Sequence, residues 1–386
     1  MYHKLGNIPH KRHTIFRKED GSLHHEELFG NEGFSGDSSL VYHLHAPTQV
    51  KAIGKCVNMN PKEAVSENVT SRKLKGKNLK PHNDYLKSKT PLFFNQDLII
   101  GMSVSGSNKP DYFYKNATGD ELIFVHEGKG ILKTFLGNIP FFDGDYLIIP
   151  KGIIYQIEFE SENNKVFYID SASSISFPKR YLSKKGQFLE NSPVCERDIR
   201  LPQELKTVDA KGEFTIIINK NHHLHEVVYA HHPFDVVVWD GYCYPFAISI
   251  HDFEPLTGSI HQPPTIHQLF EAHNFVICSF VPRKYDYHPE AIPAPYNHSN
   301  VDSDEVLYYV DGDFMSRNSV VQGQITLHPG GIPHGPHPGS VEKSIGKERT
   351  DELAVMIDPF KPLMITEDAL LIEDENYHKS WQHNIE

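Results

Sequence analysis

One spacing template occurs twice in this sequence, and it restricts the possible folds more than any other feature. The later copy runs through Glu305, Gly312, Gly323, Pro329, Gly331 and His334. The earlier copy runs through Glu121, Gly128, Gly144, Pro150, Gly152 and Tyr155, and its spacings differ only in the stretch between the first two glycines. Glycine and proline at such positions are typical of tight turns between strands. A repeat with an offset of roughly 180 residues predicts two copies of one β-barrel.

The residues around both copies favour strands over helices. Short runs rich in Ile, Leu, Val, Phe and Tyr, such as "ELIFVHEG" and "EVLYYVDG", are separated by Gly, Asn and Asp. We therefore predict an all-β dominated fold with two cupin (jelly-roll) barrels and an extended N-terminal arm. The expected boundaries are an arm and basic loop over 1–90, a first cupin over 91–180, a linker over 181–225, a second cupin over 226–360 and a tail over 361–386.

The later copy carries three candidate metal ligands, because a histidine also stands seven residues before its glutamate. These ligands are His298, Glu305 and His334, with Asn300 at the place where many cupins have another histidine. Two imidazoles and one carboxylate on one face of an ion suit Fe(II), since the opposite face stays open. A carboxylate at the start of the apolar run "VLYYV" also needs a cation to offset its burial.

The earlier copy lacks two of these ligands. Tyr155 stands in the place of His334, and Tyr114 stands seven residues before Glu121. We predict that the first barrel is a degenerate cupin without metal ligands and that the chemistry belongs to the second barrel.

Composition excludes several other classes of protein. A net charge of −12 argues against nucleic-acid or anionic-membrane partners. No apolar run reaches the length of a signal peptide or a membrane span, and the four cysteines form no CxxC pair. These features predict a cytoplasmic protein with reduced thiols.

Several longer stretches resemble the homogentisate 1,2-dioxygenase family. They are "EELFGNEGFSG", "HHPFDVVVWDGYCYPF", "PYNHSNVDSDE", "LHPGGIPHGPH" followed by "VEK", and "ELAVMID", in the order in which the family has them. The resemblance implies an Fe(II) enzyme that opens the ring of homogentisate with O2 to give maleylacetoacetate, in tyrosine and phenylalanine breakdown. It also implies iron on the three ligands named above and a homo-oligomer, either a trimer or a hexamer.

The resemblance also implies roles for residues around the metal. The stretch "SIHQPPTIH" places the family's catalytic base at His261, and His328 falls on a histidine that lines the family's pocket. We expect the substrate to lie against His328, His334 and Phe314. Phe314 stands where the family has a tyrosine that holds the substrate carboxylate. A lost hydrogen bond to a charged group would cost about 1.5–3 kcal/mol unless another donor replaces it.

Three alternatives remain open at this point. The first is a ring-cleaving enzyme of the gentisate type, which Phe314 favours because the carboxylate would then sit directly on the ring. The second is a non-catalytic cupin that binds a metal or a small ligand. The third is a cupin isomerase that uses manganese or zinc.

Overall fold

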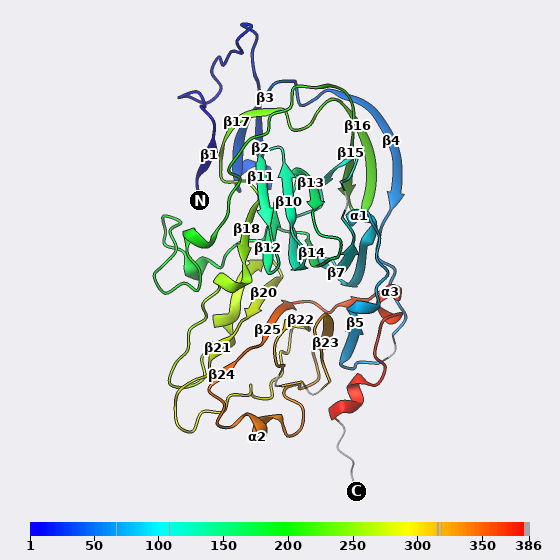
Figure 1. The fold of residues 1–386 in the computed structure, drawn as a ribbon, viewed down its shortest axis with the longest axis vertical. Helices are drawn as coiled ribbons and strands as arrows, with labels where there is room; N and C mark the ends of the chain where they lie inside the picture. The colour runs from blue at the N-terminus through cyan, green and yellow to red at the C-terminus, as the bar shows by residue number, and fades with distance from the viewer. Residues whose placement is uncertain (67, 108, 315, 318, 382–386) are drawn as a thin grey trace.

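The chain folds into two β-barrels that lie one above the other in Figure 1. This computed structural model describes residues 1–66, 68–107, 109–314, 316–317 and 319–381. The upper barrel in the figure holds most strands of the first half of the chain, and the lower barrel holds β20, β22, β23 and β25. The prediction of an all-β fold with two cupin barrels is confirmed.

Two seven-stranded sheets form the first barrel, and a four-stranded sheet extends it. The first sheet has the order β11 (Gly137–Phe141), β10 (Gly130–Thr134), β13 (Ile154–Phe159), β8 (Phe113–Asn116), β15 (Lys211–Lys220), β16 (His223–His231) and β4 (Val50–Asn58). The second has the order β18 (Phe246–Ser249), β12 (Asp145–Ile149), β9 (Glu121–Glu127), β14 (Asn164–Ser171), β7 (Leu98–Ser105), β6 (Lys89–Phe94) and β26 (Met364–Ile365). The extension has the order β1 (His3–Leu5), β17 (Val236–Gly241), β3 (Ser38–His43) and β2 (His25–Gly30).

A six-stranded sheet forms the body of the second barrel. Its order is β19 (Gln268–Ala272), β20 (Phe275–Phe280), β25 (Leu353–Pro359), β22 (Glu305–Asp311), β23 (Gln324–His328) and β5 (Arg72–Lys75). A separate pair consists of β21 (Arg283–Lys284) and β24 (Arg349–Thr350).

The helices are short. The α-helices are α1 (Tyr85–Ser88), α2 (Ser340–Ser344) and α3 (Glu367–Leu370). The 3₁₀ helices are η1 (Glu32–Phe34), η2 (Gly76–Asn78), η3 (Lys179–Tyr181), η4 (Glu196–Asp198), η5 (Ile250–Asp252), η6 (Pro264–His267) and η7 (Tyr377–Trp381). Within the described residues, no helix has the length and apolar character that crossing a membrane would require.

Strand β22 is buried on both faces because its side chains alternate between two cores. Val306 and Tyr308 belong to a core shared by the two barrels, whereas Leu307 and Tyr309 face the interior of the second barrel. Tyr308 stacks on Phe167 of the first barrel, with 4.7 Å between ring centroids. Because side chains alternate with a period of two along a strand, the same alternation turns Glu305 toward the barrel interior.

The turn glycines of the template adopt backbone conformations that other residues rarely take. Gly312 has φ 94° and its counterpart Gly128 has φ 132°. A Cβ atom on Gly312 would lie 1.9 Å from the carbonyl oxygen of Asp351, so a side chain does not fit there. The repeated glycine therefore ends β9 and β22 in the same way.

The sheets divide the chain differently from the boundaries expected from the sequence. Strand β15 lies within the expected linker, β16 crosses the expected boundary between the linker and the second cupin, and β17 and β18 lie within the expected second cupin. All four strands belong to sheets of the first barrel or its extension. The N-terminal arm is extended as predicted, but its strands contribute to both barrels. Strand β4 joins a sheet of the first barrel, and β5 joins the sheet of the second barrel. The order of strands along the sequence does not reveal these pairings, because they connect residues about 100 positions or more apart.

Candidate metal centre

Glu305 occupies the first position of β22 and lies between two other polar side chains. On one side it pairs with His328 of β23. On the other side Val306 pairs with Ile357 of β25, which places Asp358 next to Glu305. The barrel interior therefore carries a row of three polar residues on adjacent strands.

His298 and His334 lie in two loops that the backbone holds together. The amide of His298 donates to the carbonyl of His334 at 2.8 Å, and the amide of His334 donates back at 2.9 Å. The ring centroids of the two histidines are 4.4 Å apart. This pair of hydrogen bonds positions both imidazoles without the help of a bound ligand.

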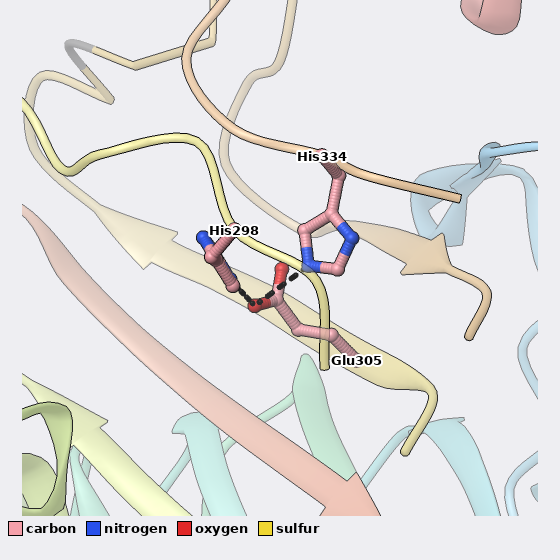
Figure 2. Close-up of side chains that lie close together, drawn as sticks. All are labelled: His298, Glu305 and His334. Atoms are coloured by element: carbon pink, nitrogen blue, oxygen red, sulfur yellow. Dashed lines mark ion pairs between the residues drawn. The ribbon is translucent and has the colours of Figure 1, made fainter. Parts of the chain in front are cut away.

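Figure 2 shows the three predicted ligands turned toward one another. Nε2 of His298 lies 3.5 Å from Oε2 of Glu305, and Nε2 of His334 lies 3.6 Å from the same oxygen. One donor atom from each residue lies within 4.8 Å of the others, and no other group of three such side chains was found in the part of the chain that the structure describes. The predicted triad is thus brought together in space.

The hydrogen bonds of the two imidazoles leave their Nε2 atoms available. Nδ1 of His298 lies 3.1 Å from the carbonyl oxygen of Tyr296, and Nδ1 of His334 lies 3.2 Å from that of Ile332. A proton on Nδ1 is donated to these carbonyls, which leaves the Nε2 lone pair free for a cation. Nε2 of His334 is buried without a hydrogen-bond partner. Such an orphaned acceptor fits a site that holds a metal ion.

The charge of Glu305 also fits a cation site. Burial alone would raise its pKa, but the imidazoles of His298, His328 and His334 around the carboxylate outweigh burial and hold the pKa well below its usual range. The carboxylate is therefore ionised. By contrast, burial and then the charge of Glu305 raise the pKa of Asp358 well above its usual range.

His328 lies behind Glu305 and has no exposed surface. Its Nδ1 lies 2.7 Å from Oε1 of Glu305, and its Nε2 lies 3.3 Å from the hydroxyl of Tyr377. Both ring nitrogens are thus engaged, and this geometry supports a role in orienting Glu305. Direct contact between His328 and a substrate remains a prediction.

Phe314 lies in the apolar interior of the second barrel and is 7% exposed. Its ring packs edge-on against Tyr309, with 4.8 Å between centroids. Tyr309 in turn shares a hydrogen bond with Thr326 at 3.0 Å. The substrate contact expected for Phe314 stays a prediction.

His261 lies outside the triad and is connected to it through another ring. Its ring centroid lies 4.9 Å from that of Tyr296, which lies 6.2 Å from that of His298. Nδ1 of His261 is 3.8 Å from a carboxylate oxygen of Asp286. The side chain is 42% exposed, so it can meet a molecule that enters from solvent. Its role as a base remains a prediction.

Sequence reasoning missed three residues that lie behind Glu305 and His328, on the side away from the two other triad residues. Arg317 is buried with Nη2 at 4.0 Å from Oε1 of Glu305. Tyr377 and Trp381, from the C-terminal 3₁₀ helix, contact His328. No spacing signal marks these residues, because they come from a loop and from a segment about 60 positions further along the chain.

In the first barrel, a lysine lies beside Glu121, the glutamate that corresponds to Glu305. Nζ of Lys89 lies 3.2 Å from Oε1 of Glu121 and 2.8 Å from Asp170, and the hydroxyl of Tyr155 donates to Oε2 of Glu121 at 3.0 Å. Tyr155 packs edge-on against Tyr114. The ammonium group thus neutralises the glutamate that the template keeps in both barrels. This arrangement is consistent with the predicted loss of metal binding in the first barrel.

A large open pocket lies beside the loops that carry His298 and His334 and not at the triad itself. It has a volume of about 1040 Å³, and its lining includes Val65, Val301, Gly330 and Leu363 but none of the three triad residues. The triad meets solvent through His298, whose side chain is 35% exposed.

Comparison with known proteins places this geometry in a family. A family model described as the N-terminal part of homogentisate 1,2-dioxygenase matches residues 93–250. The chain is also 42% identical over 383 residues, 99% of each chain, to a protein of Saccharolobus solfataricus named "Putative dioxygenase". The chain belongs to the homogentisate dioxygenase family. The stretch matched by the family model ends one residue after β18, the last strand of the first barrel's sheets before the second barrel begins.

More distant members of the homogentisate dioxygenase family share less of the sequence. The homogentisate 1,2-dioxygenases of Mus musculus and Homo sapiens are each 24% identical over 307 residues, which is 75% of this chain and 68% of each relative. Among solved structures, a cupin 2 conserved barrel domain protein from Leptotrichia buccalis aligns over 81% of this chain and 100% of its own, with 13% identity and a TM-score of 0.32. As a member of this family the chain is a dioxygenase, and its family and cupin fold point to a metal ion and to an aromatic substrate with O2.

Proposed function

We propose that this protein is an Fe(II)-dependent ring-cleaving dioxygenase that converts homogentisate and O2 to maleylacetoacetate in tyrosine and phenylalanine breakdown. The observation that carries the proposal is the convergence of Nε2 of His298, Nε2 of His334 and Oε2 of Glu305. Two neutral imidazoles and one carboxylate are the donor set that suits ferrous iron in oxygenases. A homo-oligomer in the cytoplasm is part of the same proposal.

The three ligands would hold the iron, and the barrel would keep them in place. When bound, Fe(II) supplies open coordination positions and the one-electron chemistry that O2 needs in order to react. The protein contributes geometry, because the mutual backbone hydrogen bonds between His298 and His334 fix both imidazoles before any ligand arrives. Oε1 of Glu305 is held by His328, which leaves Oε2 for the iron.

Two residues would act on the substrate itself. His261 would accept a proton from a ring hydroxyl, since its partly exposed ring adjoins Tyr296 beside the ligand His298. Phe314 would pack against the ring and supply no hydrogen bond to the carboxylate. Of the two tyrosines in β22, Tyr309 faces the same barrel interior as Phe314. Its hydroxyl would replace the donor that the family's tyrosine offers to the substrate carboxylate.

The decisive experiment measures O2 uptake by protein loaded with Fe(II) under anaerobic conditions, with homogentisate and gentisate compared side by side. We expect rapid uptake with homogentisate and growth of the product's near-ultraviolet absorbance. His334→Ala should abolish uptake, whereas His223→Ala, on strand β16 of the first barrel, should leave it unchanged.

Other outcomes would favour the alternative functions. Phe314 in place of a hydrogen-bonding tyrosine favours an enzyme of the gentisate type, and uptake with gentisate alone would establish that substrate. A non-catalytic metal-binding cupin would bind one Fe(II) per chain and consume no O2 with either acid. That last result would overturn the proposed ring cleavage of these substrates.

A further inference from the structure

The two oxygens of Glu305 face different groups. Oε2 faces the ligand histidines, whereas Oε1 lies 2.7 Å from Nδ1 of His328 and 4.0 Å from Nη2 of Arg317. In the part of the chain that the structure describes, Glu305 is the one carboxylate within ion-pair distance of Arg317. The carboxylate is therefore anchored through one oxygen and presents the other to a cation.

Arg317 also contacts the loop that carries the second histidine. Its Nη1 donates to the carbonyl oxygen of Gly335, which follows His334 directly, and to that of Ser316 at 3.3 Å. The side chain is only 6% exposed, and its Nε has no hydrogen-bond partner. A buried guanidinium needs a nearby negative charge and several acceptors to offset its lost hydration. One side chain thus links the segment behind Glu305 to the loop of His334.

The C-terminal 3₁₀ helix η7 supports both groups that hold Oε1. The hydroxyl of Tyr377 lies 3.3 Å from Nε2 of His328, on the far side of that ring from Glu305. The guanidinium carbon of Arg317 lies 5.7 Å from the ring centroid of Trp381. Trp381 stacks on His337 at 4.0 Å between centroids, and Ser380 is hydrogen-bonded to the same histidine at 2.6 Å. These contacts place η7 directly behind the ligand set.

We propose that Arg317 is a positioning residue for the metal centre, and that helix η7 completes the centre by supporting Arg317 and His328 behind Glu305. This inference rests on the proposed metal binding by His298, Glu305 and His334. Partners of metal-bound carboxylates and imidazoles fix the orientation of the ligands, and their loss commonly weakens metal affinity by about 10–100-fold. Arg317 acts through Glu305 and needs no contact with the substrate.

The test compares Arg317→Met with Arg200→Met. Arg200 pairs with the buried carboxylate of Asp145 in the first barrel, so its loss also removes an arginine from a buried carboxylate but leaves the triad untouched. Metal affinity is measured with Co(II) by competition with a chelator, and the visible absorption of bound Co(II) reports the ligand geometry. We expect Arg317→Met to lower Co(II) affinity by roughly 10–100-fold and to change the spectrum. Arg200→Met should alter neither.

Milder variants keep the inference testable if Arg317→Met does not fold. Arg317→Lys retains the charge but loses the forked geometry, so it should recover only part of the affinity. Tyr377→Phe removes one hydroxyl, and we expect a loss of a few fold. Wild-type affinity and spectrum in Arg317→Met would overturn the inference. Wild-type protein that binds Co(II) but consumes no O2 after iron loading would instead contradict the proposed function and leave this inference standing.

Discussion

Nδ1 of His328 donates a hydrogen bond to Oε1 of Glu305 across 2.7 Å in the buried interior of the second barrel. Burial, and next the nearby charge of Arg317, lower the pKa of His328 to about 4. The ring is therefore neutral at physiological pH and can donate from only one nitrogen. Because an ionised carboxylate can only accept, Glu305 selects the tautomer with the proton on Nδ1, and the hydroxyl of Tyr377 donates to Nε2.

Replacing His328 by phenylalanine would remove this donor while keeping an aromatic ring. We expect Co(II) or Fe(II) affinity to fall by about 10–100-fold, because Glu305 would lose its closest hydrogen-bond donor. His328→Gln should recover part of the affinity. If His328→Phe instead binds metal normally and raises only the KM for substrate, the histidine contacts the substrate directly. Chelator competition and O2-uptake kinetics separate the two results.

Substituting Glu305 by glutamine tests the charge of the ligand set. The amide keeps the shape but cannot neutralise a divalent cation, so we expect bound metal to fall from one ion per chain to a small fraction. O2 uptake should fall by at least about a hundredfold, because the reaction needs the bound metal ion. Metal analysis of the purified variant is the direct measurement. Stoichiometric metal in Glu305→Gln would rule out Glu305 as a required ligand.

Phe314→Tyr tests how the carboxylate of the substrate is held. A phenol at this position can donate to a carboxylate, and a hydrogen bond to a charged group is worth about 1.5–3 kcal/mol. We expect the KM for homogentisate to fall by about tenfold or more. The KM for a hydroquinone without a side-chain carboxylate should stay the same. Equal changes with both substrates would mean that the new hydroxyl acts on packing against Tyr309 and not on the carboxylate.

His43 should make the stability of the first barrel depend on pH. Burial would lower its pKa, but hydrogen bonds to Asp235 and Glu27 outweigh burial and raise the pKa to about 9. The folded state therefore binds this proton more tightly than the unfolded state, whose pKa is about 6.5. The contribution is complete below about pH 6.5 and is lost as the pH rises to about 9, and it amounts to on the order of 3 kcal/mol.

The measurement for His43 is urea unfolding between pH 6 and about pH 10, compared with His43→Gln. The wild-type free energy of unfolding should decline across this window more steeply than that of the variant. Parallel curves would show that the histidine is not protonated in the folded state.

Lys89→Met would leave Glu121 and Asp170 buried without their cation. Breaking a buried ion pair in this way costs about 3–5 kcal/mol, so the free energy of unfolding should fall by that amount. Metal content should not change, because Lys89 belongs to the first barrel. Lys133→Met, which removes a more exposed pair with Glu158, is the control and should cost about 0–1 kcal/mol. A second bound metal ion in Lys89→Met would show that the ammonium excludes metal from the first barrel.

Short-range patterns in the sequence were enough to predict the fold class and to select the three residues that converge. Each turn of the template needs a glycine such as Gly312 or a proline such as Pro329 at a set distance from a strand, so spacing reports local geometry. The same logic identified Tyr155 as the counterpart of His334 in the first barrel. What spacing cannot report is which distant strand completes a sheet.

The parts that sequence reasoning missed all depend on distant pairings. Strand β5 joins β23 through residues more than 240 positions apart, and Arg317 becomes significant only because the barrel brings it to Glu305. Nothing in the sequence around Trp381 indicates that its ring stacks on His337, because the two residues come from separate segments. Contacts of this kind depend on the packing of the whole chain, and they produce no periodic pattern of residues in the sequence.

Strand β5 joins the second barrel to the segment that leads into η7. Leu74 pairs with Ile325 of the second barrel, and Lys73 bonds to Asp374 just before η7, through its ammonium at 3.0 Å and through its backbone carbonyl at 2.8 Å. The second barrel is therefore complete only when β5 and the segment that leads into η7 are both in place. Helix η7 supports His328 and Arg317 behind Glu305, so the arrangement of the candidate metal centre depends on segments from both halves of the chain.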